Sequence, residues 1–188
     1  SDVYKRQHYN WVQDNIKKVD KASNGKIGYI YIPDMGPEGL NEFSRYFYPQ
    51  LDKEGLIIDD RANGGGNVSP MILERLSREP YRLTMRRGSA RIGTVPDAVQ
   101  VGPKVCLINK YSASDGDLFP WGFRALGLGK LIGTRTWGGI VGISGSLPYM
   151  DGTDIRVPFF TSFDPKTGSW IIENHGVDPD ILIDNCLL

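Results

Sequence analysis

The sequence predicts an α/β fold with a largely parallel central sheet, and three observations lead to that prediction. Short apolar runs alternate along the chain with segments of helical periodicity, which is the pattern of strands joined by crossover helices. Two of these runs, 55–59 and 104–108, are apolar at consecutive positions, as strands are when both faces of a sheet are covered. Each of the two leads into a segment rich in small and polar residues, where parallel sheets carry their functional loops.

Helices are predicted where apolar residues recur every three or four positions and a turn signal follows. In the first helix, Val12, Ile16 and Val19 share one face, and Asn24-Gly25 ends the helix. In the helix expected to begin at residue 69, Pro70 stands in the first turn, where its missing N–H costs nothing. The predicted helices are 9–23, 39–48, 69–77 and 118–126.

The remaining apolar segments are predicted to be strands, with a last short strand after Asp180. Residues 86–96 are expected to form a loop. A turn sequence at 164–168 separates two apolar segments, so 154–160 and 169–172 are expected to pair as a hairpin. The other predicted strands are 26–32, 55–59, 80–87, 104–108 and 130–133.

Composition limits the kinds of partner that the chain can have. The 188 residues suit one domain, alone or with a short appendage, and 22 basic residues balance 22 acidic ones, so nothing favours nucleic acid as a partner. The two cysteines do not make a disulfide framework, and Cys106, inside an apolar strand pattern, is expected to pack in the core. No metal-ligand spacing, membrane-spanning run or secretory signal occurs in the sequence. We therefore expect a soluble, cytoplasmic protein with no metal or other cofactor and no membrane partner.

The first seven residues are set apart from the rest of the chain. The segment 2–7 resembles the in-frame translation of a transposon-end adapter, as arises where a reading frame begins at the edge of a sequenced fragment. An ordinary polar tail is the other interpretation. We exclude residues 1–7 from the fold prediction, assign 8–188 to one core domain and expect native sequence upstream.

The most informative stretch is 111–117, which lies between a predicted strand and a predicted helix. Hydrolases place a nucleophilic serine at such a junction, because the turn projects Oγ and the helix start offers free N–H groups to an oxyanion. Ser114 is that candidate, and the N–H of Asp115 is the neighbouring oxyanion donor. The competing interpretation is that Ser114 only caps the helix.

A second polar segment, 59–66, follows the other buried strand and should open at the same edge of the sheet. Its three consecutive glycines bring backbone N–H groups close to a ligand, so Gly65 or Gly66 could supply a second oxyanion donor. The glycine spacing and the Lys-Ser/Thr pair of a phosphate-binding loop are missing. Asp59 and Arg61 are expected to brace the loop as an ion pair.

Four stretches together, in this order along the chain, resemble the C-terminal core of the tricorn-type proteases, which belong with the C-terminal processing peptidases of the S41 type. The segment 27–36 fits the same pattern, and the match runs from about Trp11 to Asp184. The resemblance implies a crotonase-like and Clp-like fold and serine peptidase activity. The four stretches are 59–66, 111–117, 129–139 and 173–180.

The resemblance also implies a role for particular residues. Ser114 would be the nucleophile. The N–H groups of Asp115 and of Gly66, or Gly65, would hold the tetrahedral oxyanion. Glu173, an ordinary loop acid when taken alone, would be the acid of a Ser-His-Ser-Glu tetrad, in which it steadies a serine that orients the histidine base.

Substrate and assembly are implied in the same way. Trp137, Gly138 and Gly139, in a glycine-rich loop, would border the substrate, with the Trp137 ring lining its channel. The implied substrates are short peptides released by a larger protease. The implied assembly of the whole protein is a homo-oligomer, and the tricorn pattern suggests a hexamer.

The general base is the part of the site that the chain does not show. Processing peptidases use a lysine in a loop after the serine, whereas Gly139 stands at that position here and no lysine lies between Lys130 and Lys166. Tricorn-type proteases take their histidine and its serine from an upstream subdomain, ahead of a PDZ-like domain. Neither His8 nor His175 matches the family's base position. We therefore expect the 188 residues alone to be nearly inactive, because the members of a catalytic unit act together.

Two other functions fit parts of the sequence. The same fold serves binding proteins, so a non-catalytic module that binds a ligand or peptide is the first alternative. Against it, Ser114, the glycine run and Glu173 all remain together. A crotonase-like acyl-CoA enzyme is the second alternative. It also uses paired N–H donors, but it needs neither the serine turn nor Glu173.

Overall fold

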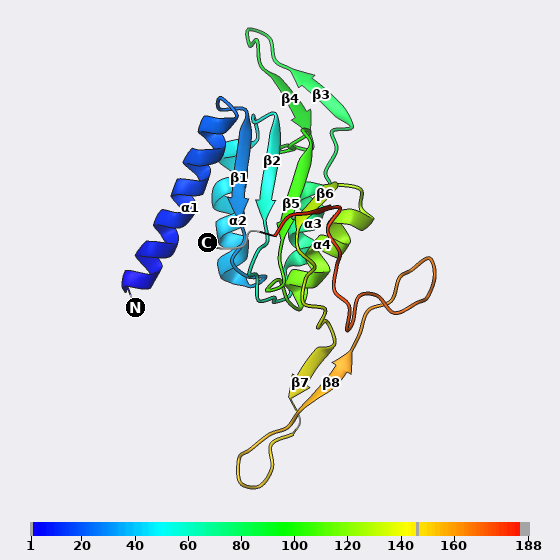
Figure 1. The fold of residues 1–188 in the computed structure, drawn as a ribbon. Helices are drawn as coiled ribbons and strands as arrows, with labels where there is room; N and C mark the ends of the chain where they lie inside the picture. The colour runs from blue at the N-terminus through cyan, green and yellow to red at the C-terminus, as the bar shows by residue number, and fades with distance from the viewer. Residues whose placement is uncertain (1, 146, 185–188) are drawn as a thin grey trace.

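A five-stranded parallel sheet with helices on both faces forms the body of the molecule (Figure 1). The computed structural model describes residues 2–145 and 147–184. The strand order is β1-β2-β5-β6-β9, and every pairing within this sheet is parallel, which confirms the predicted fold class. The strands are β1 (Ile27–Tyr31), β2 (Gly55–Asp59), β5 (Lys104–Ile108), β6 (Gly129–Gly133) and β9 (Ile181–Leu182).

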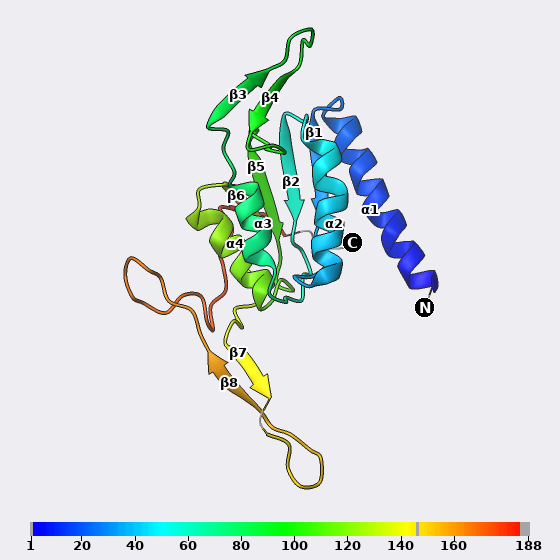
Figure 2. The ribbon, with the colours of Figure 1, turned by 180° about the vertical axis from the view of Figure 1, so that it is seen from behind.

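The helices cover the two faces of the sheet unequally. Figures 1 and 2 show α1 along one face beside β1, whereas α2, α3 and α4 lie together on the other face. All four predicted helices are present; α3 begins where expected, whereas α1, α2 and α4 begin earlier. The helices are α1 (Asp2–Ala22), α2 (Pro37–Phe47), α3 (Ser69–Leu76) and α4 (Asp115–Ala125), with a 3₁₀ turn (Tyr48–Gln50) after α2.

Side chains of β1 alternate between the two faces. Ile30 enters the main core, which α2, α3 and α4 cover, whereas Tyr29 and Tyr31 pack on the other side against Val12 of α1. This period of two is what a strand with both faces covered requires. Cys106 of β5 is fully buried in the main core, as predicted.

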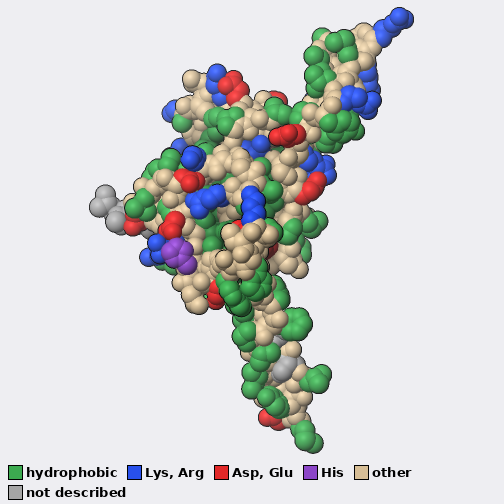
Figure 3. Space-filling view, turned by 90° about the vertical axis from the view of Figure 1, so that its right-hand side faces the viewer, with side chains coloured by type: hydrophobic (Ala, Val, Ile, Leu, Met, Phe, Trp, Pro, Cys, Tyr) green, Lys and Arg blue, Asp and Glu red, His purple; other side chains and the backbone are tan. Residues whose placement is uncertain are grey.

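Two β-hairpins project from the body of the molecule. They are β3 (Arg82–Met85) with β4 (Ile92–Val95), and β7 (Gly142–Gly145) with β8 (Arg156–Phe160). Figure 3 shows both as extensions that carry many apolar side chains at their surface. The loop expected at 86–96 is therefore wrong in its second half, which β4 occupies. Because β4 is not buried and pairs only with β3, its sequence lacks the alternation that marks a core strand.

The predicted pairing of 154–160 with 169–172 is also wrong, because β8 pairs with β7. The Phe160 ring lies over Gly142, where a Cβ would be only 2.0 Å from the ring. The predicted turn at 164–168 does form, since the Asp164 N–H donates to Ser169 O over 2.9 Å. A single bridge, rather than a paired strand, closes it.

The N-terminal segment and the lengths of the helices bear on two expectations about the chain as a whole. Helix α1 begins at Asp2, so residues 2–7 are helical, and their origin stays a prediction. Within residues 2–145 and 147–184, no helix is long and apolar enough to span a bilayer.

Candidate active site

Three loops meet at the carboxyl edge of the parallel sheet, where such sheets place their sites. The Ala113 N–H donates to Asn63 O over 2.8 Å, which joins the loop after β5 to the loop after β2. The Trp137 N–H donates to Ser112 O over 3.0 Å, which joins the loop after β6 to the same turn. The sequence prediction that the two polar segments share one edge is therefore confirmed. The loops are 60–66, 109–114 and 134–141.

Ser114 begins α4 in a backbone conformation that L-residues rarely adopt. Its φ is +56° and its ψ is −120°, and such a conformation costs about 1–3 kcal/mol. The hydroxyl makes no capping hydrogen bond to α4. Capping therefore does not account for Ser114, whereas a strained strand-to-helix turn is the conformation of a nucleophile elbow.

Two glycines make room for this turn. A Cβ on Gly65, where φ is +96°, would lie 2.7 Å from the Cβ of Ser114. A Cβ on Gly116 would lie 2.5 Å from the carbonyl oxygen of Asn63. Both contacts are shorter than real Cβ atoms make, so only glycine lets the serine turn and the glycine run touch.

The two sequence candidates for the second oxyanion donor differ in their hydrogen bonds. The Gly65 N–H already donates to Asn63 Oδ1 over 2.9 Å. Within the described ranges, the N–H groups of Gly66 and Asp115 have no internal acceptor. Gly66, which follows Gly65, and Asp115, which follows Ser114, therefore keep N–H groups that could donate to a ligand, and Gly65 shapes the loop instead.

Asn63 organises this edge of the sheet, a role that the sequence analysis missed. Besides its bonds to Ala113 and Gly65, its Nδ2 donates to Ile32 O over 3.2 Å. The side chain is fully buried. One residue thus ties the end of β1, the glycine run and the serine turn together. An asparagine before glycines is typical of turns, so its sequence context did not distinguish it.

The Asp115 side chain has a structural task. Its carboxylate accepts the N–H of Ser69 over 3.0 Å and also accepts the Ser69 hydroxyl. Ser69 is the first residue of α3, so this buried carboxylate supplies the cap that the preceding residue, Val68, does not. Only the backbone N–H of Asp115 remains for chemistry.

The expected ion pair between Asp59 and Arg61 is confirmed. Arg61 Nε and Nη2 donate to the two carboxylate oxygens of Asp59 over 2.8 and 2.6 Å. The Tyr29 hydroxyl donates to the same carboxylate from β1. Asp59 is fully buried, so this pair fixes the start of the glycine run against the sheet.

Two acids hold the glycine-rich loop after β6. Asp117 Oδ1 accepts the N–H of Gly138 over 2.8 Å, and burial raises the pKa of Asp117 against the opposing effect of its hydrogen bonds. Glu173 Oε2 accepts the N–H groups of Ile140 and Val141 over 2.7 and 2.9 Å. Glu173 therefore anchors the point from which the β7–β8 hairpin leaves the site.

The three residues predicted to border the substrate lie in this loop. Trp137 is 65% exposed, so it is not a core residue. Its ring lies over Gly139, where a Cβ would be 2.1 Å from the indole. Gly138 has φ +88° and packs against the backbone of residues 175 and 176. The structure thus presents an exposed indole on a glycine-lined loop that is bonded to the serine turn.

The two histidines are engaged with other groups. The His8 ring lies 5.2 Å from the Tyr31 ring and 5.9 Å from the Trp11 ring. His175 Nε2 lies 2.9 Å from Asp178 Oδ2 in an exposed pair. His175, with Arg135, lowers the pKa of Asp178. The expectation that neither histidine is the base of this site stays a prediction.

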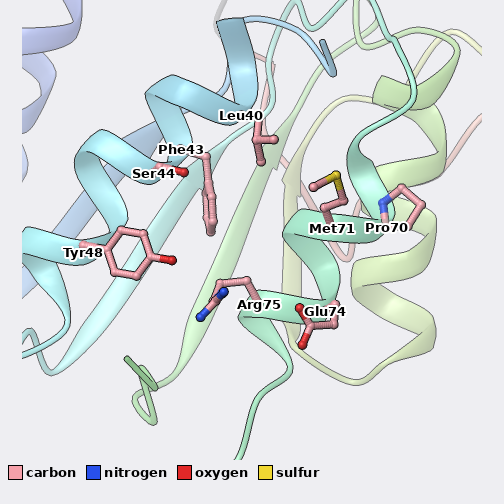
Figure 4. A pocket seen from close by; sticks show the side chains of 8 residues that line it. All are labelled: Leu40, Phe43, Ser44, Tyr48, Pro70, Met71, Glu74 and Arg75. Atoms are coloured by element: carbon pink, nitrogen blue, oxygen red, sulfur yellow. The ribbon is translucent and has the colours of Figure 1, made fainter. Parts of the chain in front are cut away.

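A groove on the surface of the described residues lies away from these loops. It has a volume of about 520 Å³ and runs between α2 and α3 (Figure 4). Arg75 points across it, with its guanidinium 5.7 Å from the centre of the Tyr48 ring. The serine turn does not line it. Its lining residues are Leu40, Phe43, Ser44, Tyr48, Pro70, Met71, Glu74 and Arg75.

Known proteins are similar in sequence to this chain over most of its length. The model of Peptidase family S41 matches residues 26–183. Tricorn protease from Thermoplasma volcanium is 47% identical over 177 residues, which are 93% of this chain and 17% of that protein. Tricorn protease homolog 1 from Streptomyces coelicolor is 37% identical over 175 residues, which are 93% of this chain and 16% of that protein. The chain thus spans less than a fifth of the length of these relatives.

Solved structures show the same likeness. A crystal structure of the tricorn protease superposes with a TM-score of 0.85 at 45% identity, covering 93% of this chain and 17% of that one. The photosystem II D1 C-terminal processing protease superposes with a TM-score of 0.61 at 22% identity, covering 84% of this chain and 42% of that one. At the lower identity the likeness shows the fold alone.

Proposed function

The chain belongs to peptidase family S41, and we propose that it is the catalytic core of a tricorn-type serine peptidase that hydrolyses short peptides. The observation that carries the proposal is the state of Ser114. Its hydroxyl makes no capping bond to α4, its backbone is strained, and Gly65 lies directly against it. Among the described residues, the N–H groups of Asp115 and of Gly66, which follow Ser114 and Gly65, have no acceptor. A serine that only stabilised the fold would need none of these features.

In the proposed reaction, Ser114 Oγ attacks the carbonyl carbon of the scissile peptide bond while a base takes the hydroxyl proton. The carbonyl oxygen becomes an oxyanion, which accepts hydrogen bonds from the N–H groups of Gly66 and Asp115. One such donor contributes about 10²–10³-fold to the rate in serine hydrolases. The amine leaves with the proton from the base, and water then hydrolyses the acyl group on Ser114 by the same steps.

The base is proposed to come from outside these 188 residues. His175 is paired with Asp178, and His8 packs against aromatic rings of α1 and β1. Gly139 stands where processing peptidases carry a lysine. We therefore expect the chain by itself to keep only the residual catalysis that oxyanion donors and binding supply, roughly 10³-fold over water.

Glu173 is proposed to complete the tetrad from its present position. Both hydrogen bonds that it accepts use Oε2. Among the described residues, Oε1 has no donor, so the proposed serine hydroxyl from outside this chain would bind there. Glu173 would then link the histidine to the loop that carries Trp137.

Assembly and location follow from the same proposal. A tricorn-type parent would be a homo-oligomer, with a hexamer as the specific expectation, and it would act in the cytoplasm. Sedimentation of the full-length parent tests the assembly, and a monomer at micromolar concentration would contradict it.

Peptide hydrolysis by the full-length parent tests the activity. Ser114→Ala should abolish turnover, whereas Ser89→Ala, in the exposed turn between β3 and β4, should leave turnover unchanged. Normal turnover by the Ser114→Ala parent would refute the proposed nucleophile. Steady hydrolysis by the purified 188-residue chain, lost in its own Ser114→Ala variant, would refute the proposed external base.

A further inference from the structure

Two buried carboxyl groups lie beneath the serine turn, and the proposed reaction uses neither. Asp60 follows β2 directly, and Asp117 lies in the first turn of α4. Both residues are 0% exposed. Both carboxyl oxygens of Asp60, and Oδ2 of Asp117, have no hydrogen-bond partner among the described residues. Buried polar atoms are rarely left unpaired, so these three oxygens call for an explanation.

Among the described residues, no cation forms an ion pair with Asp60. The neighbouring guanidinium, that of Arg61, donates through Nε and Nη2 to the two oxygens of Asp59. The charges that act most strongly on Asp60 are those of two acids, Asp59 beside it and Asp117 of α4, and Asp60 in turn acts on the Cys106 thiol of β5. An ionised Asp60 would therefore be a buried charge without a partner, next to charges of the same sign, which proteins avoid by taking up a proton.

We propose that Asp60 is a neutral, proton-bearing carboxylic acid in the folded protein and that it is a positioning residue for the serine turn. The backbone of Asp60 anchors that turn. Its carbonyl oxygen accepts the Ser112 hydroxyl over 2.8 Å and the Asn63 N–H over 3.2 Å. Ionisation of the side chain would draw Asp60 toward water and pull these two anchors with it.

Burial and neighbouring charges both favour the protonated form of Asp60. Burial raises the pKa of Asp60 well above its ordinary value of 3.8, and the charges of Asp59 and Asp117 raise it further. The Asn63 and Ser112 side chains lie near the carboxyl group without forming a hydrogen bond to it, and they offset only part of this effect. An acid whose pKa is raised by folding stabilises the fold below its ordinary pKa, and that stability is lost as pH rises through the folded value. The inference does not depend on which reaction Ser114 performs.

Infrared spectroscopy of the 188-residue chain tests the proton directly. At neutral pH the wild type should show the C=O stretch of a protonated carboxyl group, although ordinary carboxyl groups are then ionised. Asp60→Asn should remove that band, and Asp117→Asn should retain one. A wild type without the band, or a band that only Asp117→Asn removes, would overturn the proposal. The wild-type spectrum alone decides the first point, even if a variant fails to fold.

Denaturant unfolding at a series of pH values tests the link to the turn. As Asp60 ionises, the wild-type folding constant should fall by up to about tenfold per pH unit. Asp60→Asn, a neutral isostere, should flatten this slope, and hydrogen exchange of residues 112–117 should lose its excess pH dependence in the same variant. Asp52→Asn removes an exposed acid and should leave both profiles as in the wild type. Equal slopes for wild type and Asp60→Asn would contradict the proposal.

Discussion

Gly65 lies directly against Ser114, so closely that a Cβ on Gly65 would be 2.7 Å from the Cβ of the serine. The two residues come from loops that follow different strands, β2 and β5, and these strands are neighbours in the sheet. Parallel pairing therefore brings the glycine run and the serine turn to the same edge. The contact is what turns two unrelated sequence motifs into one site.

Substitution of Gly65 should damage this contact. Gly65→Ala adds a methyl group that meets Ser114 and strains a residue with φ +96°, so the free energy of unfolding should fall by at least about 2 kcal/mol. Gly64→Ala is the matched control, because a Cβ there has no atom within 4 Å, and its effect should stay within about 0.5 kcal/mol. Denaturant unfolding measures both. Equal losses in the two variants would show that the contact does not matter.

Removal of the Asn63 side chain should lower turnover as well as stability. Asn63→Ala leaves the partly buried Gly65 N–H without its acceptor and should cost about 1–3 kcal/mol of stability. Because Gly66 follows in the same loop, turnover by the parent should also fall, by about the 10²-fold expected for a displaced oxyanion donor. Asn67→Ala, at an exposed position, serves as the control. Unchanged turnover in Asn63→Ala would show that Asn63 does not hold the oxyanion donor in position.

The sequence was sufficient for the elements that bury apolar side chains. The runs at 55–59 and 104–108 became β2 and β5 with the predicted bounds, because core strands carry a continuous apolar signal. Strands β4 and β7 escaped prediction. Each pairs with one partner on a projecting hairpin, so neither has a buried face to leave a pattern in the sequence.

Within the site, the sequence identified residues but did not distinguish their roles. It left the second donor open between Gly65 and Gly66, since the answer depends on where the Asn63 side chain points. It left Ser114 open between nucleophile and cap, since only the backbone angles and the missing capping bond separate these readings. Sequence spacing does not encode such side-chain directions.

The ion pair between Asp59 and Arg61 should contribute far more to the free energy of unfolding than an exposed ion pair does. Arg61→Ala leaves the buried Asp59 carboxylate unpaired and should cost about 3 kcal/mol, the low end for breaking a buried pair, because Arg61 is 31% exposed. Arg45→Ala breaks an exposed pair with Glu42 and should cost at most about 1 kcal/mol. Unfolding at neutral pH compares the two. A loss in Arg61→Ala no larger than in Arg45→Ala would mean that Asp59 is not desolvated.

Trp137 should affect substrate handling without affecting stability. Its ring is exposed, so Trp137→Ala should change the free energy of unfolding by no more than about 0.5 kcal/mol. If the ring borders the peptide, kcat/KM of the parent should fall about tenfold, the effect of losing roughly 1.4 kcal/mol of binding. Trp170→Ala, which removes a 63% exposed indole beyond β8, is the control and should leave kcat/KM unchanged. Equal kcat/KM in the unaltered parent, Trp137→Ala and Trp170→Ala would show that Trp137 does not border the substrate.

Ser114 should be a position where function opposes stability. Its φ of +56° and ψ of −120° suit glycine and strain every other residue. Ser114→Gly should therefore be more stable than Ser114→Ala by about 1 kcal/mol or more, although both lack the nucleophile. Lys18, which is exposed within α1, is the control. Because glycine in a helix is about 1 kcal/mol less stable than alanine, Lys18→Gly should be less stable than Lys18→Ala. The order of the Gly and Ala variants should thus reverse between the two positions. If alanine is the more stable residue at both, the serine turn stores no strain, and the backbone argument for a nucleophile loses its basis.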